Sequence, residues 1–356
     1  MAQKTFVLVR VISGPVVFPQ NCLGGKPEVS DLLQRGHGGN TQSMNRRQFT
    51  KALGLSAVFL GLGDVGVSVT KSSPQVAITM DDFLWDKSLR LTPQQRNRAI
   101  LEALRSRGNL KAALFVKGKN VDNDKGKELL REWDTAGHII GNHSYSHQYL
   151  NSEKVQADTF TADILNCEAI LKEFPRFQKL FRFPFLKEGE DAAERDAVRS
   201  FLKVHGYRNG HVTIDASDWA IDGRLATRLE KDPRADVRPY RDFYLDHMWE
   251  RSLYYDDLAR KVLGRSVKHT VLIHYNLLNA MFLGDLMDMY KAKGWHLIDA
   301  GEAFKDPVFA AEPRTVPAGE SVIWALAKET GKFDNLLRYP GEDSQYENAK
   351  MDKLGL

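Results

Sequence analysis

The stretch "ITMDDFLW", residues 78–85, joins a short apolar strand to two adjacent carboxylates, Asp81 and Asp82. Adjacent side chains of a strand point to opposite faces, so two acids at a strand end can do two different jobs. One can hold a cation while the other moves a proton. The alternative is that one of them caps the following turn, where aspartate is common.

From residue 74 onward, short apolar strands alternate with amphipathic helices. The first predicted helix has a strong start signal, with Thr92 as N-cap, Pro93 at the first helical position and Gln95 completing a capping box. The alternation predicts parallel strands joined by crossover helices, and about seven such units favour a barrel over an open sheet. No glycine-rich phosphate loop follows the first strand, which disfavours a dinucleotide-binding fold. The predicted strands cover residues 75–80, 110–118, 138–144, 180–185, 211–217, 269–275 and 295–300, and the helices cover residues 92–108, 125–137, 153–173, 191–206 and 277–294.

Two regions interrupt this rhythm within a predicted barrel domain of residues 74–305. Residues 220–268 are rich in charges and aromatic side chains and are interpreted as an insertion with at least one helix. Residues 306–356 form a polar C-terminal extension with one short apolar stretch, "SVIWALAK". No linker is long enough to argue for two independent domains.

The beginning of the chain indicates export. Paired arginines, Arg46 and Arg47, precede a short uncharged apolar run in the sequence that starts at Met44. This pattern over residues 44–70 resembles a twin-arginine signal peptide and predicts a periplasmic or extracellular protein. A basic surface helix followed by a buried one is the alternative. Residues 1–43 are then an upstream, disordered extension, and Met44 is the expected start.

Charge and cysteine content exclude several classes of partner and site. The net charge of +4 arises from residues 1–70, so the rest of the chain gives no argument for a nucleic-acid partner. The apolar run after Arg47 is too short to span a bilayer, so no stable membrane span is predicted. Two cysteines are too few for a disulfide framework or a thiolate zinc site.

Polar residues follow several of the predicted strands, at the end of a parallel barrel where chemistry gathers. His143 and His147 are four residues apart, and on a helical turn this spacing places both imidazoles on one face. Two histidines and one aspartate form a common open zinc site, although the histidine pair alone is also compatible with surface decoration. The full set of strand-end residues comprises Asp81, Asp82, His143, His147, Arg182, Phe185, Asp215, Asp218, Trp219 and His274.

Five segments, "TMDDF", "HSYSH", "RFPF", "DASDW" and "LIH", resemble the five motifs of the NodB-type polysaccharide deacetylases (carbohydrate esterase family 4), in the same order. The resemblance covers about residues 74–300. It implies a distorted (β/α)7 barrel that carries the 220–268 insertion and the C-terminal extension. It also implies a divalent metal, usually zinc, and removal of acetyl groups from an N-acetylated glycan.

The resemblance also implies residue roles around the metal. Asp82, His143 and His147 would bind the metal, and Asp81 would act as general base. Arg182 would pair with Asp81 and keep it ionised, as an adjacent cation does.

The remaining roles concern the leaving group and the oxyanion. His274 would be the general acid, and Asp218 would accept a hydrogen bond from its imidazole with Trp219 packed nearby. The backbone N–H of Phe185 would stabilise the oxyanion. The family usually has Gly-Pro after the aspartate pair, whereas Phe83 stands here and, with Leu84 and Trp85, suggests a different pocket wall.

Three functions stay open at this stage: glycan deacetylation, hydrolysis of a small non-sugar amide or imide on the same barrel, and non-catalytic glycan binding. Asp81 and His274 argue against pure binding, which needs neither base nor acid. Cobalt and nickel also suit two histidines and one carboxylate. The sequence does not name the glycan.

Overall fold

The computed structural model describes residues 73–86, 88–338 and 344–356, all within one unit, Ser68–Leu356. The predicted upstream extension (1–43) and signal peptide (44–70) lie outside these residues. Within the described part of the chain, no helix has the length and apolar character that a membrane crossing requires.

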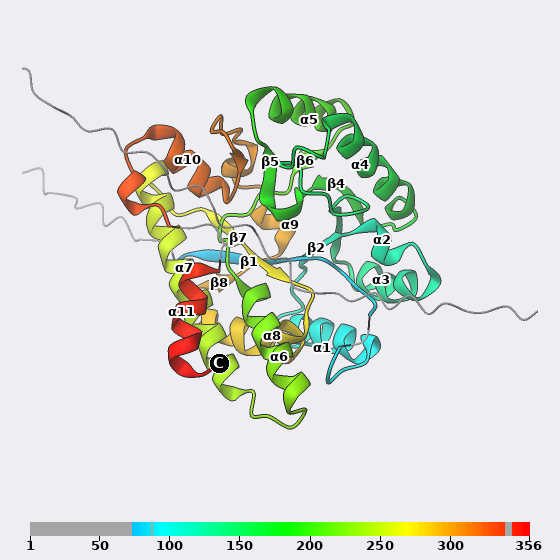
Figure 1. The fold of residues 1–356 in the computed structure, drawn as a ribbon, viewed down its shortest axis with the longest axis vertical. Coiled ribbons are helices and arrows are strands. Elements are labelled where there is room, and N and C mark those ends of the chain that lie inside the picture. Colours follow the sequence, from blue (N-terminus) through cyan, green and yellow to red (C-terminus); the bar gives the residue numbers. More distant parts are fainter. Residues whose placement is uncertain (1–72, 87, 339–343) are drawn as a thin grey trace, which may run out of the picture. The chain divides into compact units, whose positions relative to one another are not determined.

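A parallel sheet lies at the centre, and helices surround it (Figure 1). The strand order is β6-β4-β3-β2-β1-β7, with β8 also paired to β1. The first strand in the chain is therefore central, between β2 and β7. The strands are β1 Gln75–Asp81, β2 Ala113–Val116, β3 Ile139–Asn142, β4 Phe177–Phe181, β6 Arg208–Asn209, β7 Lys268–His274 and β8 His296–Leu297. This parallel arrangement confirms the predicted α/β barrel class.

The crossover helices begin and end close to the predicted positions. Thr92 and Gln95 form the expected capping box at the start of the first helix. The longer helices are α1 Pro93–Ser106, α3 Asp124–Ala136, α4 Ala157–Leu171, α5 Ala192–Val204, α6 Asp218–Lys231, α7 Arg238–Leu263, α8 Leu277–Ala292, α10 Val322–Thr330 and α11 Gln345–Leu354. Short helices are α2 Gly118–Val121, α9 Ala300–Ala303, η1 Pro184–Leu186, η2 Pro307–Ala310 and η3 Asp334–Leu336.

The curled sheet closes through residues 208–214, which contact both of its edge strands. On one side β6 pairs with β4, and Gly210 N–H donates to Phe181 O at 2.6 Å. On the other side, Ile214 forms a parallel bridge with Val271 of β7. The loop between the two contacts completes the barrel wall.

The strand predicted at residues 211–217 is reduced to that single bridge. The hydroxyl of Thr213 accepts from Thr270 N–H at 2.8 Å and donates to Thr270 O at 3.1 Å. The Thr213 side chain thus bonds the backbone N–H and C=O of Thr270 at the edge of β7. These side-chain hydrogen bonds replace part of the ladder that a paired strand would form.

The barrel interior is tightly packed around Phe115. A Cβ atom on Gly141 or Gly210 would lie 2.7 Å or 2.5 Å from its ring, so only glycine fits at these two positions. The guanidinium of Arg182 lies 3.9 Å from the centre of the same ring. Phe115 therefore supports a buried cation directly beneath the site end of the barrel.

The 220–268 region contributes to the core instead of forming a separate lobe. It contains most of α6 and all of α7, and α7 packs Tyr240, Tyr244, Met248 and Tyr255 into the main hydrophobic cluster. These aromatic side chains are packed in the protein interior, where they are not available to stack on a sugar.

The C-terminal extension also packs onto the barrel. Ile323 of α10 and Met351 of α11 belong to the main cluster. Its strand β9 Ala318–Gly319 pairs with β5 Lys187–Gly189 in a separate antiparallel sheet, and Glu320 N–H donates to Leu186 O at 3.0 Å. The extension therefore supports the loop that carries Phe185.

Candidate active site

The carboxyl ends of the central strands bring the predicted site residues together. In the sheet register Asp81 lies beside His274 of β7. Val116 of β2 pairs with Asn142, which directly precedes His143. Because the strands are parallel, these ends meet at one edge of the barrel, as a strand-end site requires.

Asp82, His143 and His147 form a compact cluster of potential metal ligands, whose ligand atoms all lie within 4.8 Å of one another. Asp82 Oδ1 lies 3.4 Å from His147 Nε2 and 3.9 Å from His143 Nε2. This oxygen is buried and has no hydrogen-bond partner. A buried, unpaired carboxylate oxygen facing two imidazoles fits a bound cation.

The hydrogen bonds and pKa shifts of these three residues also favour a bound cation. His143 Nδ1 lies 2.8 Å from Arg182 O, which can only accept, so Nδ1 carries the proton and Nε2 offers its lone pair to the site. Burial lowers the pKa of His147 to about 3 despite the nearby Asp82 charge. Burial opposes ionisation of Asp82, but His147 and His143 outweigh it and lower its pKa. One carboxylate and two imidazoles are a donor set that suits a divalent cation.

The two histidines lie in an irregular loop and not on a helical turn. Ser144 and His147 have φ values of 60° and 62°, and Asp82 has 59°. Ser144 Oγ accepts from His147 N–H at 3.0 Å. Asp163 of α4 accepts from both the N–H and the Oγ–H of Ser146, at 2.8 Å and 2.9 Å. The Ser144 contact within the loop and the Asp163 contacts from α4 together hold the backbone at positive φ beside His147.

Asp81 lies beside the cluster and pairs with Arg182. Arg182 Nη1 donates to Asp81 Oδ1 at 2.7 Å and to Thr79 Oγ1 at 3.0 Å, and Nε donates to Gly210 O at 2.8 Å. The second oxygen, Asp81 Oδ2, lies 3.7 Å from His143 Nε2. One oxygen of this carboxylate is thus held by a buried cation while the other faces the metal cluster.

His274 and Asp218 form a second polar pair across the site. His274 Nδ1 lies 2.7 Å from Asp218 Oδ1, and His274 N–H donates to Asp218 Oδ2 at 2.8 Å. Burial lowers the pKa of His274, but the contact with Asp218 and the charges of Asp82 and Asp81 outweigh it and raise the pKa to about 10. The imidazole is therefore set up to hold a proton in the absence of a metal.

Two predicted aromatic residues lie at the rim. Phe185 has a φ of 56°, is 43% exposed, and its ring contacts those of His147 and Tyr149, at centroid distances of 4.6 Å and 5.3 Å. Trp219 follows Asp218 at the start of α6 and is 40% exposed. Both side chains face solvent beside the polar centre.

Phe83 does not form a pocket wall, contrary to the prediction. It is fully buried, with its ring 4.6 Å from that of Tyr275. Its carbonyl accepts a hydrogen bond from Asn120 at 2.8 Å. The departure from Gly-Pro is accommodated by core packing, and Leu84 lines the surface instead.

Several site-supporting residues were not predicted from sequence. All but one of them hold residues that are distant in sequence, so no local pattern identifies them. The strand asparagine directly before His143 had a weak signal, because it is a polar residue at a fully buried strand end. These residues are Thr79, Asn142, Asp163, Tyr244 and Asn279.

A shallow pocket of about 560 Å³ borders the site next to His274, where Tyr275 and Asn276 line it. One wall is the face of α6 that carries Asp222, Ala226 and Glu230, which are four residues apart. Such spacing aligns side chains along one helix face, over a length of about 12 Å. The opposite side includes Leu84 and Leu89, so the pocket joins an apolar wall to an acidic one.

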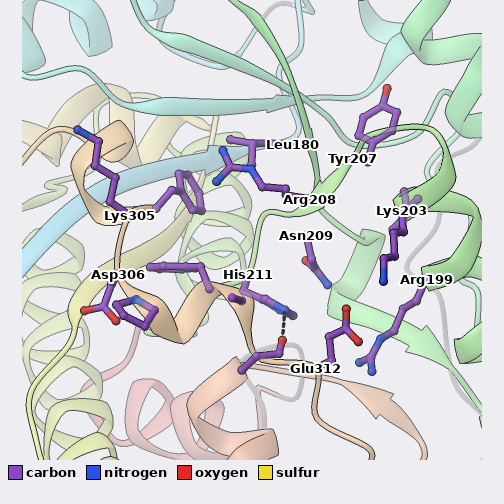
Figure 2. Close-up of a pocket in the computed structure, with 16 residues that line it drawn as sticks. Leu180, Arg199, Lys203, Tyr207, Arg208, Asn209, His211, Lys305, Asp306 and Glu312 are labelled. Carbon is purple, nitrogen blue, oxygen red and sulfur yellow. Dashed lines mark hydrogen bonds between the residues drawn. The ribbon is translucent and has the colours of Figure 1, made fainter.

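A second pocket of about 560 Å³ lies between α5 and residues 304–312 (Figure 2). It is lined by none of the predicted site residues. Two of its polar lining residues are paired, because buried Glu188 accepts from Arg199 at 2.6 Å and 2.8 Å and from Asn209 at 2.9 Å. This pocket connects structural elements and is separate from the strand-end site.

Comparison with known proteins relates this site to one family. The family model described as polysaccharide deacetylase matches residues 68–209. The peptidoglycan-N-acetylglucosamine deacetylase of Bacillus cereus is 30% identical over 146 residues, which span 41% of this chain and 46% of that protein. The match thus covers less than half the length of that relative.

Two solved deacetylase structures align with part of this chain. The chitin deacetylase of Colletotrichum lindemuthianum aligns with a TM-score of 0.45 and 21% identity, over 65% of this chain and 88% of the other. The peptidoglycan deacetylase PdaC of Bacillus subtilis aligns with a TM-score of 0.43 and 20% identity, over 66% and 91%.

Proposed function

We propose that the protein removes N-acetyl groups from an N-acetylated glycan, and the match of residues 68–209 to the polysaccharide deacetylase family model supports this proposal. The carrying observation is the placement of Asp81 and His274 at neighbouring strand ends beside the Asp82–His143–His147 cluster. A proton acceptor and a proton donor flanking a metal cluster suit amide hydrolysis, because water must lose a proton and the leaving amine must gain one.

Asp82, His143 and His147 would hold the metal, and zinc is the proposed ion. The unpartnered Asp82 oxygen and the two imidazole lone pairs fit it, and they would also accept cobalt or nickel. When bound, such an ion polarises the acetamide carbonyl and lowers the pKa of water.

Asp81 is proposed as the general base. Arg182 holds Oδ1, so Oδ2 on the cluster side is the oxygen that accepts the proton of the attacking water. The backbone N–H of Phe185 donates to the carbonyl oxygen as negative charge develops on it. The positive φ of Phe185 and its ring contact with His147 support this role, since strained backbone clusters at functional sites.

His274 is proposed as the general acid. Its Nδ1 is engaged by Asp218, which leaves Nε2 to donate a proton to the departing nitrogen. The C–N bond then breaks, and the products are acetate and the free amine of the sugar. Trp219 at the rim supplies a flat apolar surface beside this acid.

The substrate proposal is a glycan chain, because the pocket beside His274 is open and joins polar and apolar walls. A neighbouring sugar unit would contact the α6 face and Leu89 there. Phe83, which motivated the small-amide alternative, is buried and gives that alternative no support.

Acetate release from a panel of N-acetylated glycans, with and without chelator, tests this function. Asp82→Asn should lose bound metal and activity together, whereas Asp81→Asn should abolish acetate release with metal still bound. Asp86→Asn, an exposed carboxylate of the same loop, is the matched control and should retain both. Full activity of Asp81→Asn would refute the role of Asp81 as general base. Activity on small amides alone would refute the proposal that the substrate is a glycan.

We also propose export through the twin-arginine pattern that begins near Met44. Replacing Arg46 and Arg47 together with lysine should retain the protein inside the cell. Lys51→Gln, which keeps the arginine pair, is the control, and equal export of all three proteins would refute the proposal.

A further inference from the structure

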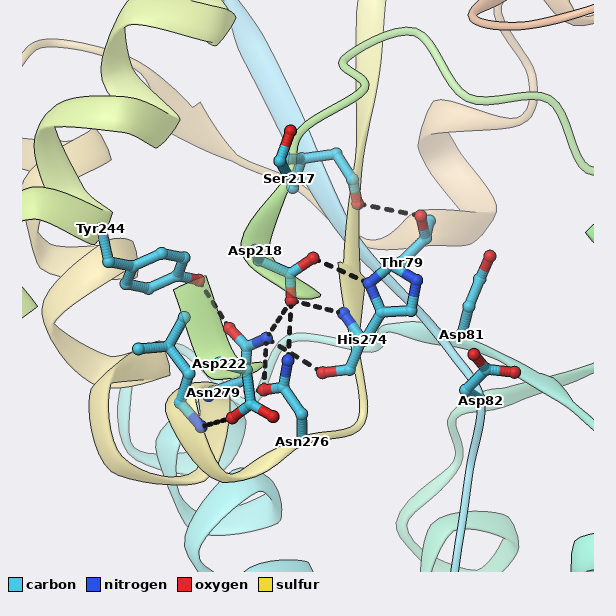
Figure 3. A network of polar contacts seen from close by, with 12 residues as sticks. Thr79, Asp81, Asp82, Ser217, Asp218, Asp222, Tyr244, His274, Asn276 and Asn279 are labelled. Carbon is cyan, nitrogen blue, oxygen red and sulfur yellow. Dashed lines mark hydrogen bonds and ion pairs between the residues drawn. The ribbon is translucent and has the colours of Figure 1, made fainter. Parts of the chain in front are cut away.

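The side chain of Asn279, in the first turn of α8, is fully buried beneath the Asp218–His274 pair (Figure 3). Its amide nitrogen lies 2.7 Å from Asp218 Oδ2 and 2.9 Å from His274 O. A third acceptor, Asn276 Oδ1, lies at 3.0 Å. One amide group therefore contacts both partners of the pair as well as the loop that joins β7 to α8.

Tyr244 of α7 determines which way this amide faces. Its hydroxyl donates to Asn279 Oδ1 at 2.5 Å, and Tyr244 is itself fully buried. Burial raises the pKa of Tyr244 well above its ordinary value, so the hydroxyl keeps the proton it donates. With Oδ1 fixed by this donor, the amide N–H groups must point toward Asp218 and His274.

Asp218 needs such support because it is wholly buried and accepts several hydrogen bonds at once. His274 contributes its N–H and its Nδ1–H, and Asn276 Nδ2 adds a contact at 3.1 Å. Asn279 donates to Asp218 from outside the His274–Asn276 segment. Together with Tyr244 it links Asp218 to α8 and α7. A hydrogen-bond network of this kind fixes the rotation of the carboxylate and, through it, the plane of the imidazole.

We propose that Asn279 and Tyr244 are positioning residues for the acid, which hold Asp218 so that His274 Nε2 faces the site. The proposal rests on the proposed function, since it assigns a role around the proposed acid. Neither residue needs to touch substrate. They act through Asp218, across the contact between α7 and α8.

The chain offers a matched control in Tyr290. This tyrosine is also fully buried between the same two helices, and its hydroxyl lies 2.6 Å from Ser252 Oγ, away from Asp218. Tyr244→Phe and Tyr290→Phe each remove one buried hydroxyl from the same helix pair. A purely structural role for Tyr244 therefore predicts the same kinetic effect from both variants.

Tyr244→Phe should lower kcat by about threefold to tenfold with KM nearly unchanged, because one hydrogen bond of the network is lost. Tyr290→Phe should leave kcat at the wild-type value while lowering the melting temperature to a similar extent. Asn279→Leu should lower kcat by about tenfold or more, because it removes a hydrogen bond to a charged group. Equal kcat for the two phenylalanine variants would overturn the proposal.

A second measurement uses the metal-free protein and needs no substrate. NMR of ring-labelled histidine follows the titration of His274, assigned by its absence in His274→Gln. The charged and titratable groups around this imidazole are Asp218, Asp222, Asp81, Asp82 and His147. Only the contact with the first of these should change in the variants.

The His274 midpoint should move to lower pH in Tyr244→Phe and Asn279→Leu and should stay in place in Tyr290→Phe. An unchanged midpoint in both site variants would overturn the positioning role even if kcat fell. If the wild-type protein released no acetate from any glycan, the proposed function would fail, yet the titration would still test whether Asn279 and Tyr244 hold the pair.

Discussion

Arg182 and Asp81 form an ion pair inside the barrel, with Nη1 donating to Oδ1 at 2.7 Å and both side chains almost fully buried. Asp81 is the last residue of β1, and Arg182 directly follows β4. The pair therefore joins strands that are not neighbours in the sheet. It serves the fold and the site at once, because the same arginine supports the barrel wall at Gly210. Removing one partner leaves a buried charge without compensation.

Arg182→Met should therefore lower the free energy of unfolding by about 3–5 kcal/mol and abolish acetate release. The double variant Asp81→Asn/Arg182→Met should be more stable than Arg182→Met alone, because the stranded carboxylate is gone. Chemical denaturation of the four proteins in this cycle measures the coupling. Arg107→Met, which breaks a pair with the exposed Asp288, is the control and should cost under about 1 kcal/mol. Additive losses at Asp81 and Arg182 would contradict the coupling.

The loop that carries the proposed metal ligands His143 and His147 should depend on Ser144 and Asp163. Ser144→Ala removes the acceptor for His147 N–H, and Asp163→Ala releases Ser146. Each variant should weaken metal binding by about tenfold or more, because these contacts hold a strained backbone that presents a ligand. Calorimetric titration of the apoprotein measures this affinity. Asp158→Ala, at an exposed position of the same helix, should bind metal as tightly as wild type, and equal weakening there would contradict the local role.

His138 should make stability depend on pH below neutrality. Its Nδ1 accepts from Ala112 N–H at 3.0 Å, and burial, with a smaller effect of Lys111, lowers its pKa from 6.5 to about 4. In the unfolded chain His138 binds a proton below about pH 6.5, whereas in the folded protein it binds one only below about pH 4. Stability therefore falls as pH falls through this window. The loss should reach about 3 kcal/mol.

His138→Asn tests this dependence, because the asparagine oxygen can accept the same hydrogen bond and cannot titrate. Denaturant unfolding between pH 7 and pH 4 should show a slope reduced by about one proton relative to wild type. Equal slopes for the two proteins would contradict the assignment.

Gly210 should tolerate no side chain. Its Cβ would lie 2.5 Å from the Phe115 ring and 3.3 Å from Phe181 O, so Gly210→Ala should destabilise the protein by about 1–3 kcal/mol and displace the carbonyl that binds Arg182. Gly223→Ala is the opposite case, because nothing lies within 4 Å of its Cβ in the interior of α6. That change should stabilise by about 0.5–1 kcal/mol. Melting curves compare the two, and equal effects would contradict the packing argument.

Local sequence signals predicted the elements well where the stabilising contact is itself local. The Thr92–Gln95 capping box formed as expected because both partners lie within one helical turn. The pairing of Asp81 with Arg182 followed from the family resemblance, whereas Thr79 as a second acceptor did not. Its contact with Arg182 joins residues 103 positions apart, and no pattern in one sequence encodes it.

Two conformations near the site depend on contacts that are distant in sequence. The spacing of His143 and His147 is compatible with a helical turn, but Asp163 stabilises a loop with positive φ values there. Phe83 follows the two adjacent aspartates and is expected to shape a pocket wall, but its ring packs against that of Tyr275 in the core. In both cases a tertiary partner decided a conformation that the local sequence left open.

The central position of β1 has a consequence for synthesis. Gln75 pairs with Lys268 and Asp81 pairs with His274, so the strand that emerges first from the ribosome acquires one of its neighbours near the end of translation. The segment 68–209, although recognised as a family unit, lacks that neighbour and cannot serve as a transplantable module. Nascent chains shorter than about residue 275 should expose the apolar flank of β1 and rely on chaperones until β7 arrives.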